Sequence, residues 1–140
     1  MHISAVPSVD AEIEGSSVND VNHCEERIVS QWREVAEDEQ HELCGRVDEI
    51  LRPLGFQTSL LVIRRANSIA LYFFCMTLLA LTSLRDLWRS RQLRDIVEEL
   101  FTLLTRTNMS VNRLTWPATD YDRCLQFFSS FPGKLYSLNL

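Results

Sequence analysis

The sequence predicts one α+β domain, a two-layer α/β sandwich of ferredoxin-like type in which a small antiparallel sheet packs against helices. A chain of 140 residues can build one hydrophobic core but is short for two. Only four glycines and four prolines are present, which favours long regular elements over many short strands with a turn each. Segments with helical periodicity also alternate with runs rich in β-branched and aromatic residues.

The N-terminal residues 1–22 are expected to form a flexible tail, and residues 23–140 an α+β interaction domain. The tail combines Pro, Gly, Ser and acidic residues without a sustained hydrophobic period, so burial would not compensate the entropy lost on ordering it. One short run within it, residues 3–6, could still pair as an edge strand.

Residues 24–54 are predicted to form a long helix. Their apolar side chains recur at three- and four-residue steps, as on one face of an amphipathic helix, and the stripe is interrupted near Glu39. Asp20 or Asn22 is the expected N-cap, and Pro53 with Gly55 is expected to end the element.

Residues 56–63 and 69–75 are predicted to form a β-hairpin. Both runs are short, and β-branched and aromatic residues are frequent in them. The connector, residues 64–68, contains Asn, Ser and two arginines. Two largely buried strands joined by a polar turn are therefore expected.

A second helical region is predicted over residues 83–104. Ser83 begins it with an acidic residue three positions later, as in a capping box. The apolar stripe changes phase near Ser90, so one helix and two helices meeting at a bend are both open. Trp88 and Leu100 lie on the stripe and are expected to be buried against the sheet.

The last predicted elements are a strand and a short helix. Residues 109–116 alternate between apolar and polar side chains, as in a half-buried strand, and Pro117 ends the run. Asp120 is expected to cap a helix that carries Tyr121 and Cys124 on its apolar side.

The charge of the chain disfavours nucleic-acid binding. The formal net charge is −5 and the pI is near 5.2, whereas nucleic-acid binding depends on cationic groups that neutralise phosphates. The acidic residues are concentrated in the first 50 residues, and arginine dominates the second half. We therefore expect a local basic surface there, which serves a protein partner or pairing within the chain. The arginines concerned are Arg64, Arg65, Arg85, Arg89, Arg91 and Arg94.

Two His-Cys pairs are potential zinc ligands. His41 and Cys44 would share one face of a helix, as zinc sites often require, and His23 with Cys24 precedes them. On one continuous helix the two pairs would lie about 25 Å apart. One ion could reach both only if the helix broke near Glu39, so no metal site is predicted.

No catalytic constellation is recognisable. The sequence has no glycine-rich phosphate loop and no Gly-x-Ser-x-Gly turn, and all three histidines lie in the first 41 residues. We therefore expect neither an enzyme nor a cofactor-binding protein. Four scattered cysteines do not suggest a disulfide framework, and no signal peptide is visible, which favours a reducing, cytoplasmic setting.

A membrane span is the main alternative. Residues 66–84 contain no charge, and their length suffices to cross a bilayer. Polar side chains interrupt them, however, and reduce the apolar part to residues 69–81, the length of a buried globular element. No membrane association is therefore expected, and a small single-pass membrane protein with a span near residues 66–84 is the alternative function.

Short motifs follow one another in a characteristic order between residues 60 and 130. They are Phe74-Cys75 at a strand end, Leu84-Arg85 at a helix start, Leu93-Arg94 after a break, Leu103-Leu104 at the end of a second helix, the alternating Ser110-Val111-Asn112-Arg113-Leu114, and Asp122-Arg123-Cys124-Leu125 in a last helix.

This order of motifs resembles the TRADD N-terminal (TRAF-binding) domain family, named after the death-domain adaptor of the tumour necrosis factor receptor. The resemblance implies an α/β sandwich without chemistry of its own, which docks onto a TRAF-like or death-signalling protein as an adaptor in apoptosis or innate immunity. In that family the contact uses strand connectors at one end of the sheet and the chain near the last helix. The resemblance therefore implies partner-binding residues at Arg64, Arg65, Asn67 and Ser68, and at Gln126, Ser129 and Ser130.

Overall fold

A computed structural model describes residues 5–66 and 68–130 of the chain. Its elements are, in order, β1 (Ser8–Ile13), α1 (Val18–Glu37), α2 (Cys44–Leu51), the 3-10 turn η1 (Arg52–Leu54), β2 (Thr58–Arg65), β3 (Ile69–Cys75), α3 (Leu78–Arg89), α4 (Gln92–Thr105), β4 (Val111–Thr115) and α5 (Ala118–Ser130).

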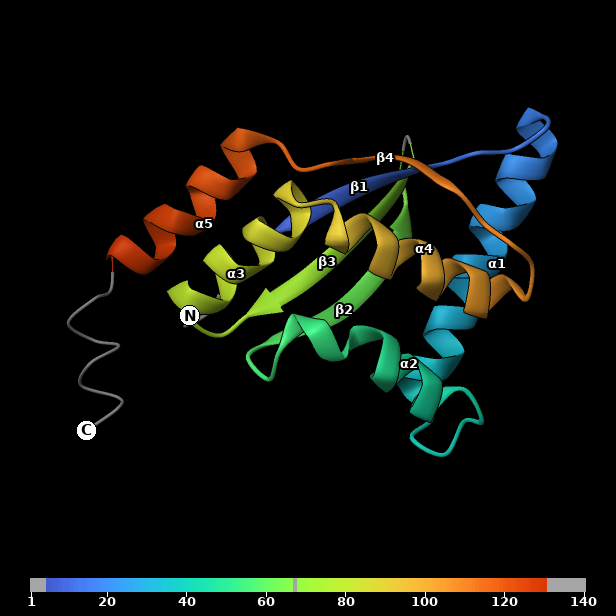
Figure 1. The fold of residues 1–140 in the computed structure, drawn as a ribbon, viewed down its shortest axis with the longest axis horizontal. Coiled ribbons are helices and arrows are strands. Elements are labelled where there is room, and N and C mark those ends of the chain that lie inside the picture. The colour runs from blue at the N-terminus through green and yellow to red at the C-terminus, as the bar shows by residue number, and fades with distance from the viewer. Residues whose placement is uncertain (1–4, 67, 131–140) are drawn as a thin grey trace.

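The four strands form one antiparallel sheet in the order β2-β3-β1-β4. Together with the chain order of strands and helices, this is the ferredoxin-like arrangement, extended by α5. Figure 1 shows α3 and α4 over one face of the sheet, with α1 and α2 beside α4 and with α5 beside α3. The prediction of a small antiparallel sheet packed against helices is confirmed.

Helix α4 lies at the centre of the core because it packs against α1, α2, α3 and β4. Leu100 on α4 is fully buried, as expected. Trp88 is only half-buried, in contrast to the prediction. Its indole Nε1 donates to the Leu114 carbonyl at 2.9 Å, and this bond holds the ring at the border between α3 and β4.

The prediction of a flexible tail over residues 1–22 is wrong where the structure describes them. Strand β1 lies between β3 and β4, and the side chains of Val9 and Ala11 are fully buried. These residues alternate with Asp10 and Glu12, which gives the period of two of a strand. So short a strand is stable only with a neighbouring strand on each side. The following helix begins at Val18, so the expected boundary between residues 22 and 23 falls inside α1.

The predicted edge strand at residues 3–6 falls partly outside the described residues. Within them, Ala5 forms an isolated bridge with Cys75.

The long helix predicted over residues 24–54 is divided. Helix α1 ends at Glu37, and the Asp38 side chain then accepts from the Gln40 amide, a local turn that competes with continuation of the helix. The N-cap is Ser17, whose hydroxyl accepts from the Asp20 amide at 3.1 Å, and not Asp20 or Asn22.

The predicted hairpin is confirmed as β2 and β3, and the helical region after it is two helices separated by a bend at Ser90 and Arg91. The first of them begins at Leu78, earlier than the expected Ser83, because Thr77 accepts from the Ala80 amide as N-cap. Residues 66–84 are thus shared between β3 and α3, and none of the helices described is long and apolar enough to cross a membrane.

The strand predicted before Pro117 is β4, and α5 begins at Ala118. Asp120 lies in the first turn of α5 and not at its N-cap. Its Oδ2 accepts from the Ser8 amide and from the Trp116 indole, each at 2.9 Å. Asp120 of α5 therefore provides a hydrogen-bond acceptor for the Ser8 amide of β1, which lies beyond the residues that pair with β4.

Candidate functional site

The sequence-predicted partner residues lie in two separate places. Arg64, Arg65 and Ser68 lie at the hairpin tip between β2 and β3, and Asn67 lies outside the described residues. Gln126 and Ser129 are exposed on α5, and Ser130 is its last residue. Figure 1 shows the hairpin tip and the end of α5 at opposite ends of β3. The structure therefore does not bring the two sets together.

The two arginines at the hairpin tip differ in their surroundings. Arg65 donates to Glu25 and Glu26 at 3.3 Å and to the Asn22 side chain at 2.9 Å, so it links β2 to α1. Arg64 is exposed, and its guanidinium lies 5.6 Å from the centre of the Tyr72 ring. Of this pair, only Arg64 has no intrachain ion pair among the described residues.

A different surface gathers arginines more densely, and we call it the arginine pocket. It is a hollow of about 630 Å3 at the junction of α3, α4 and β4. Its lining residues are Arg85, Trp88, Arg89, Arg91, Arg94, Asn112, Arg113 and Leu114.

Each arginine reaches the pocket from a defined backbone position. Helix α3 carries Arg85 and Arg89 one turn apart, and α4 carries Arg94 in its first turn. Arg91 lies between the helices with φ of 67° and ψ of 5°. This left-handed conformation is uncommon for a residue other than glycine, and such strain often lies at functional sites. Arg113 comes from β4.

An aromatic cluster supports one side of the pocket. The Arg85 guanidinium lies 3.9 Å from the centre of the Tyr121 ring, a close cation-π contact. The Trp116 ring packs edge-on against Tyr121 and Trp88, with ring centres 5.4 and 6.1 Å apart. Because these rings also hold α5 against α3 and β4, the position of Arg85 depends on the folded core.

The described lining of the arginine pocket contains five cationic side chains. None of the described residues that line it carries a carboxylate. Arg113 approaches Glu12 on the neighbouring strand at 3.7 Å, a loose and exposed ion pair. The Arg94 Nε is buried without a hydrogen-bond partner among the described residues. Glu98, one turn along α4, accepts instead from the Val111 amide at 2.8 Å.

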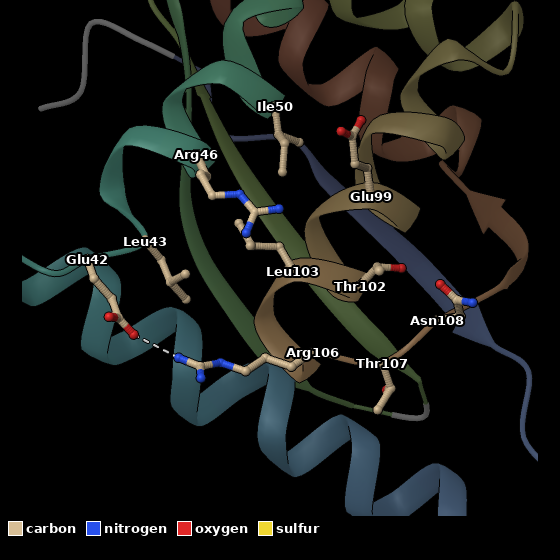
Figure 2. Close-up of a pocket in the computed structure, with 10 residues that line it drawn as sticks. All are labelled: Glu42, Leu43, Arg46, Ile50, Glu99, Thr102, Leu103, Arg106, Thr107 and Asn108. Carbon is tan, nitrogen blue, oxygen red and sulfur yellow. Dashed lines mark hydrogen bonds and ion pairs between the residues drawn. The ribbon is translucent and has the colours of Figure 1, made fainter.

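A second hollow, the α2–α4 pocket, shows how the chain balances charge elsewhere. It has a volume of about 590 Å3 and is lined by two arginines and two glutamates, among other residues. Figure 2 shows Arg106 paired with Glu42, at 2.8 Å, and the Arg46 side chain directed into the hollow, with Glu99 across from it on α4. The arginine pocket differs from it by the absence of such acidic partners from its described lining.

Cysteine and histidine residues do not form a site in the described part of the chain. No group of three or more His, Cys, Asp or Glu side chains there could hold a metal ion. His41 lies before α2, and its Nδ1 accepts from the Leu43 amide at 3.1 Å. Burial raises the pKa of Cys75 to about 12 and that of Cys124 to about 11, which keeps both thiols protonated near neutral pH.

Sequence reasoning identified most of the arginine pocket as basic surface, but not the pocket itself. Arg85, Arg89, Arg91 and Arg94 are close in sequence, and the chain from residue 52 onward is visibly rich in arginine. Arg113 joins them only because β4 pairs with β1 beside the bend between α3 and α4. No local pattern indicates that contact.

Comparison of the chain with protein-family models, curated proteins and solved structures finds no match.

Proposed function

We propose that this chain is a non-enzymatic protein-interaction module of adaptor type, which docks an acidic segment of a partner protein onto the arginine pocket. One observation carries the proposal: five arginines line one hollow whose described lining contains no carboxylate. Arginine pairs bidentately with carboxylates and is enriched among the residues that dominate interface energies. The same charge complementarity would also accelerate the encounter with an acidic partner.

The resemblance to the TRADD N-terminal domain family supports the same class of function. It suggests a TRAF-like or death-signalling protein as the partner, in apoptotic or innate-immune signalling. The residues that the resemblance implies, at the hairpin tip and the end of α5, are not among those that line the arginine pocket. Arg64, with its exposed guanidinium over Tyr72, is the hairpin residue best placed to add a second contact.

A peptide-binding measurement tests the proposal. The probe is a fluorescein-labelled peptide with a run of glutamates, and its binding is followed by fluorescence anisotropy at physiological salt. The pocket variant Arg89→Glu/Arg91→Glu reverses two charges, and we expect it to weaken binding by at least about tenfold. The glutamine version of the peptide should not bind.

The matched control is Arg27→Glu/Arg33→Glu, which changes the net charge equally on the exposed side of α1. It should weaken binding by less than about threefold, because charges outside the contact act only through the screened long-range field. Equal weakening by both variants would show that only the net charge matters, and the proposed site would be wrong. Failure of the parent protein to bind both the glutamate peptide and an acidic peptide with a central phosphoserine would contradict the proposed function.

A further inference from the structure

We propose that the arginine pocket is a phosphate-recognition site, and that its preferred ligand is a phosphomonoester on a side chain of the partner protein. This inference rests on the proposed function, because it places the phosphoryl group within the acidic segment that docks there. Partner binding would then depend on phosphorylation of the partner.

Charge favours a phosphoryl group over a single carboxylate. A carboxylate brings one charge and two oxygens, which one arginine fork already satisfies. A phosphomonoester brings a charge of about −1.5 to −2 and three acceptor oxygens, and can therefore pair with several arginines at once. Five arginines line one hollow of about 630 Å3, so a ligand with two negative charges matches their charge better than a ligand with one.

The origin of the arginines favours a compact ligand. Arg89, Arg91 and Arg94 come from the end of α3, from the bend and from the start of α4, so their side chains approach one hollow from three backbone directions. This convergence suits a tetrahedral anion better than an extended peptide, which would need a row of charges. Recognition of phosphorylated motifs by clustered arginines is a recurrent mode of peptide binding.

Two arginines of the pocket stand out by their local structure. Arg91 follows the last turn of α3 in the left-handed conformation, as Arg106 does at the end of α4, and its N–H donates to the Trp88 carbonyl at 3.2 Å. The Arg94 Nε is buried without a partner among the described residues, and such a donor is ordinarily satisfied. A ligand in the hollow would therefore contact Arg94 through its terminal guanidinium nitrogens and not through this buried atom.

The test uses the full chain and three labelled peptides with the same acidic sequence and Ser, Glu or phosphoserine at the centre. We expect the phosphoserine peptide to bind at least about tenfold more tightly than the Glu peptide, because two or more additional charge-assisted hydrogen bonds form. In Arg94→Lys the charge is kept and the planar fork is lost, so most of this preference should disappear while binding of the Glu peptide changes little. Arg33→Lys on α1 is the matched control and should leave the preference intact.

Thermal unfolding provides an independent readout. Inorganic phosphate should raise the Tm of the parent protein relative to chloride at equal ionic strength, and should raise the Tm of Arg91→Gln/Arg94→Gln much less. Equal binding of the Glu and phosphoserine peptides, with loss of both in the pocket variant, would overturn the phosphate preference and leave the proposed function standing. Vesicles containing phosphatidic acid that bind more tightly than the phosphopeptide would overturn the assignment to a protein-borne phosphoryl group.

Discussion

At the scale of single residues, the ion pairs of Arg65 show that an exposed arginine can have a structural role. Two arginines at the tip of a hydrophobic hairpin indicate a docking surface from sequence alone. In the structure, however, the Arg65 guanidinium pairs with Glu25, whose side chain is only 8% exposed. The side chain of Arg65 is itself 37% exposed, so this ion pair lies at the border of the core. Removing Arg65 would leave a largely buried carboxylate without its cation.

We therefore expect Arg65→Ala to lower the free energy of unfolding by about 1–3 kcal/mol, the usual cost of an unsatisfied buried polar group. The control is Arg64→Ala, which loses only an exposed contact over the Tyr72 ring and should cost less than about 1 kcal/mol. Chemical denaturation measures both. Equal stability of the two variants would show that Glu25 does not need Arg65, and that both arginines are free for a partner.

At the scale of elements, the bend between α3 and α4 builds the arginine pocket. The change of phase near Ser90 left one helix and two helices both open, and the structure shows two, with Arg91 between them in the left-handed region. The side chain of Arg91 contributes to the pocket, whereas its backbone conformation is one that glycine adopts without strain. Stability and ligand binding thus make opposite demands on this position.

Two substitutions of Arg91 separate these demands. In Arg91→Gly the relief of strain, about 1 kcal/mol, offsets the greater freedom of the unfolded chain, so stability should change little. Arg91→Val places a β-branched residue at positive φ and should lower the free energy of unfolding by more than about 1 kcal/mol. Both variants should lose binding of the phosphoserine peptide to a similar extent. A stable Arg91→Val protein would show that the bend relaxes, and anisotropy would then report whether the guanidinium itself matters.

At the scale of the whole molecule, the N-terminal strand completes the sheet. Strand β1 joins the β2–β3 hairpin to β4. Among the strands that the structure describes, β4 pairs with β1 alone, so its position, and with it that of Arg113, depends on β1. The first residues of the chain thus contribute indirectly to the arginine pocket near its end.

Two identical substitutions within the predicted tail test this role. Val9→Asp puts a charge at a fully buried position of β1 and should lower the free energy of unfolding by at least about 3 kcal/mol. Val18→Asp puts the same charge at a position that is 76% exposed in the first turn of α1, where the helix dipole tolerates acids, and should change stability by less than about 0.5 kcal/mol. Urea denaturation measures the free energy of unfolding of both variants. A loss of stability in Val9→Asp as small as that in Val18→Asp would favour a flexible tail.

The sequence by itself determined the elements whose signals are local. The β2–β3 hairpin and the strand that ends at Pro117 follow from β-branched and aromatic runs and from turn residues, which act over a few neighbours. The concentration of arginines in the second half was equally visible. The phase change near Ser90 left one helix and two helices open, and the structure decided for two. The prediction of one helix over residues 24–54 is wrong because the turn at Asp38, next to the interruption of the apolar stripe near Glu39, ends α1.

Only the tertiary structure decided which distant segments meet. The six residues of β1 have too little hydrophobic surface to fold alone, and their strand pattern becomes stable only between two neighbours. Tertiary structure also places Arg113 beside the arginines of α3 and α4. It likewise determines that the Glu98 carboxylate accepts from the Val111 amide. These contacts depend on strand order, and strand order follows from burial summed over the whole core. The local sequence around a residue therefore does not specify the strand order.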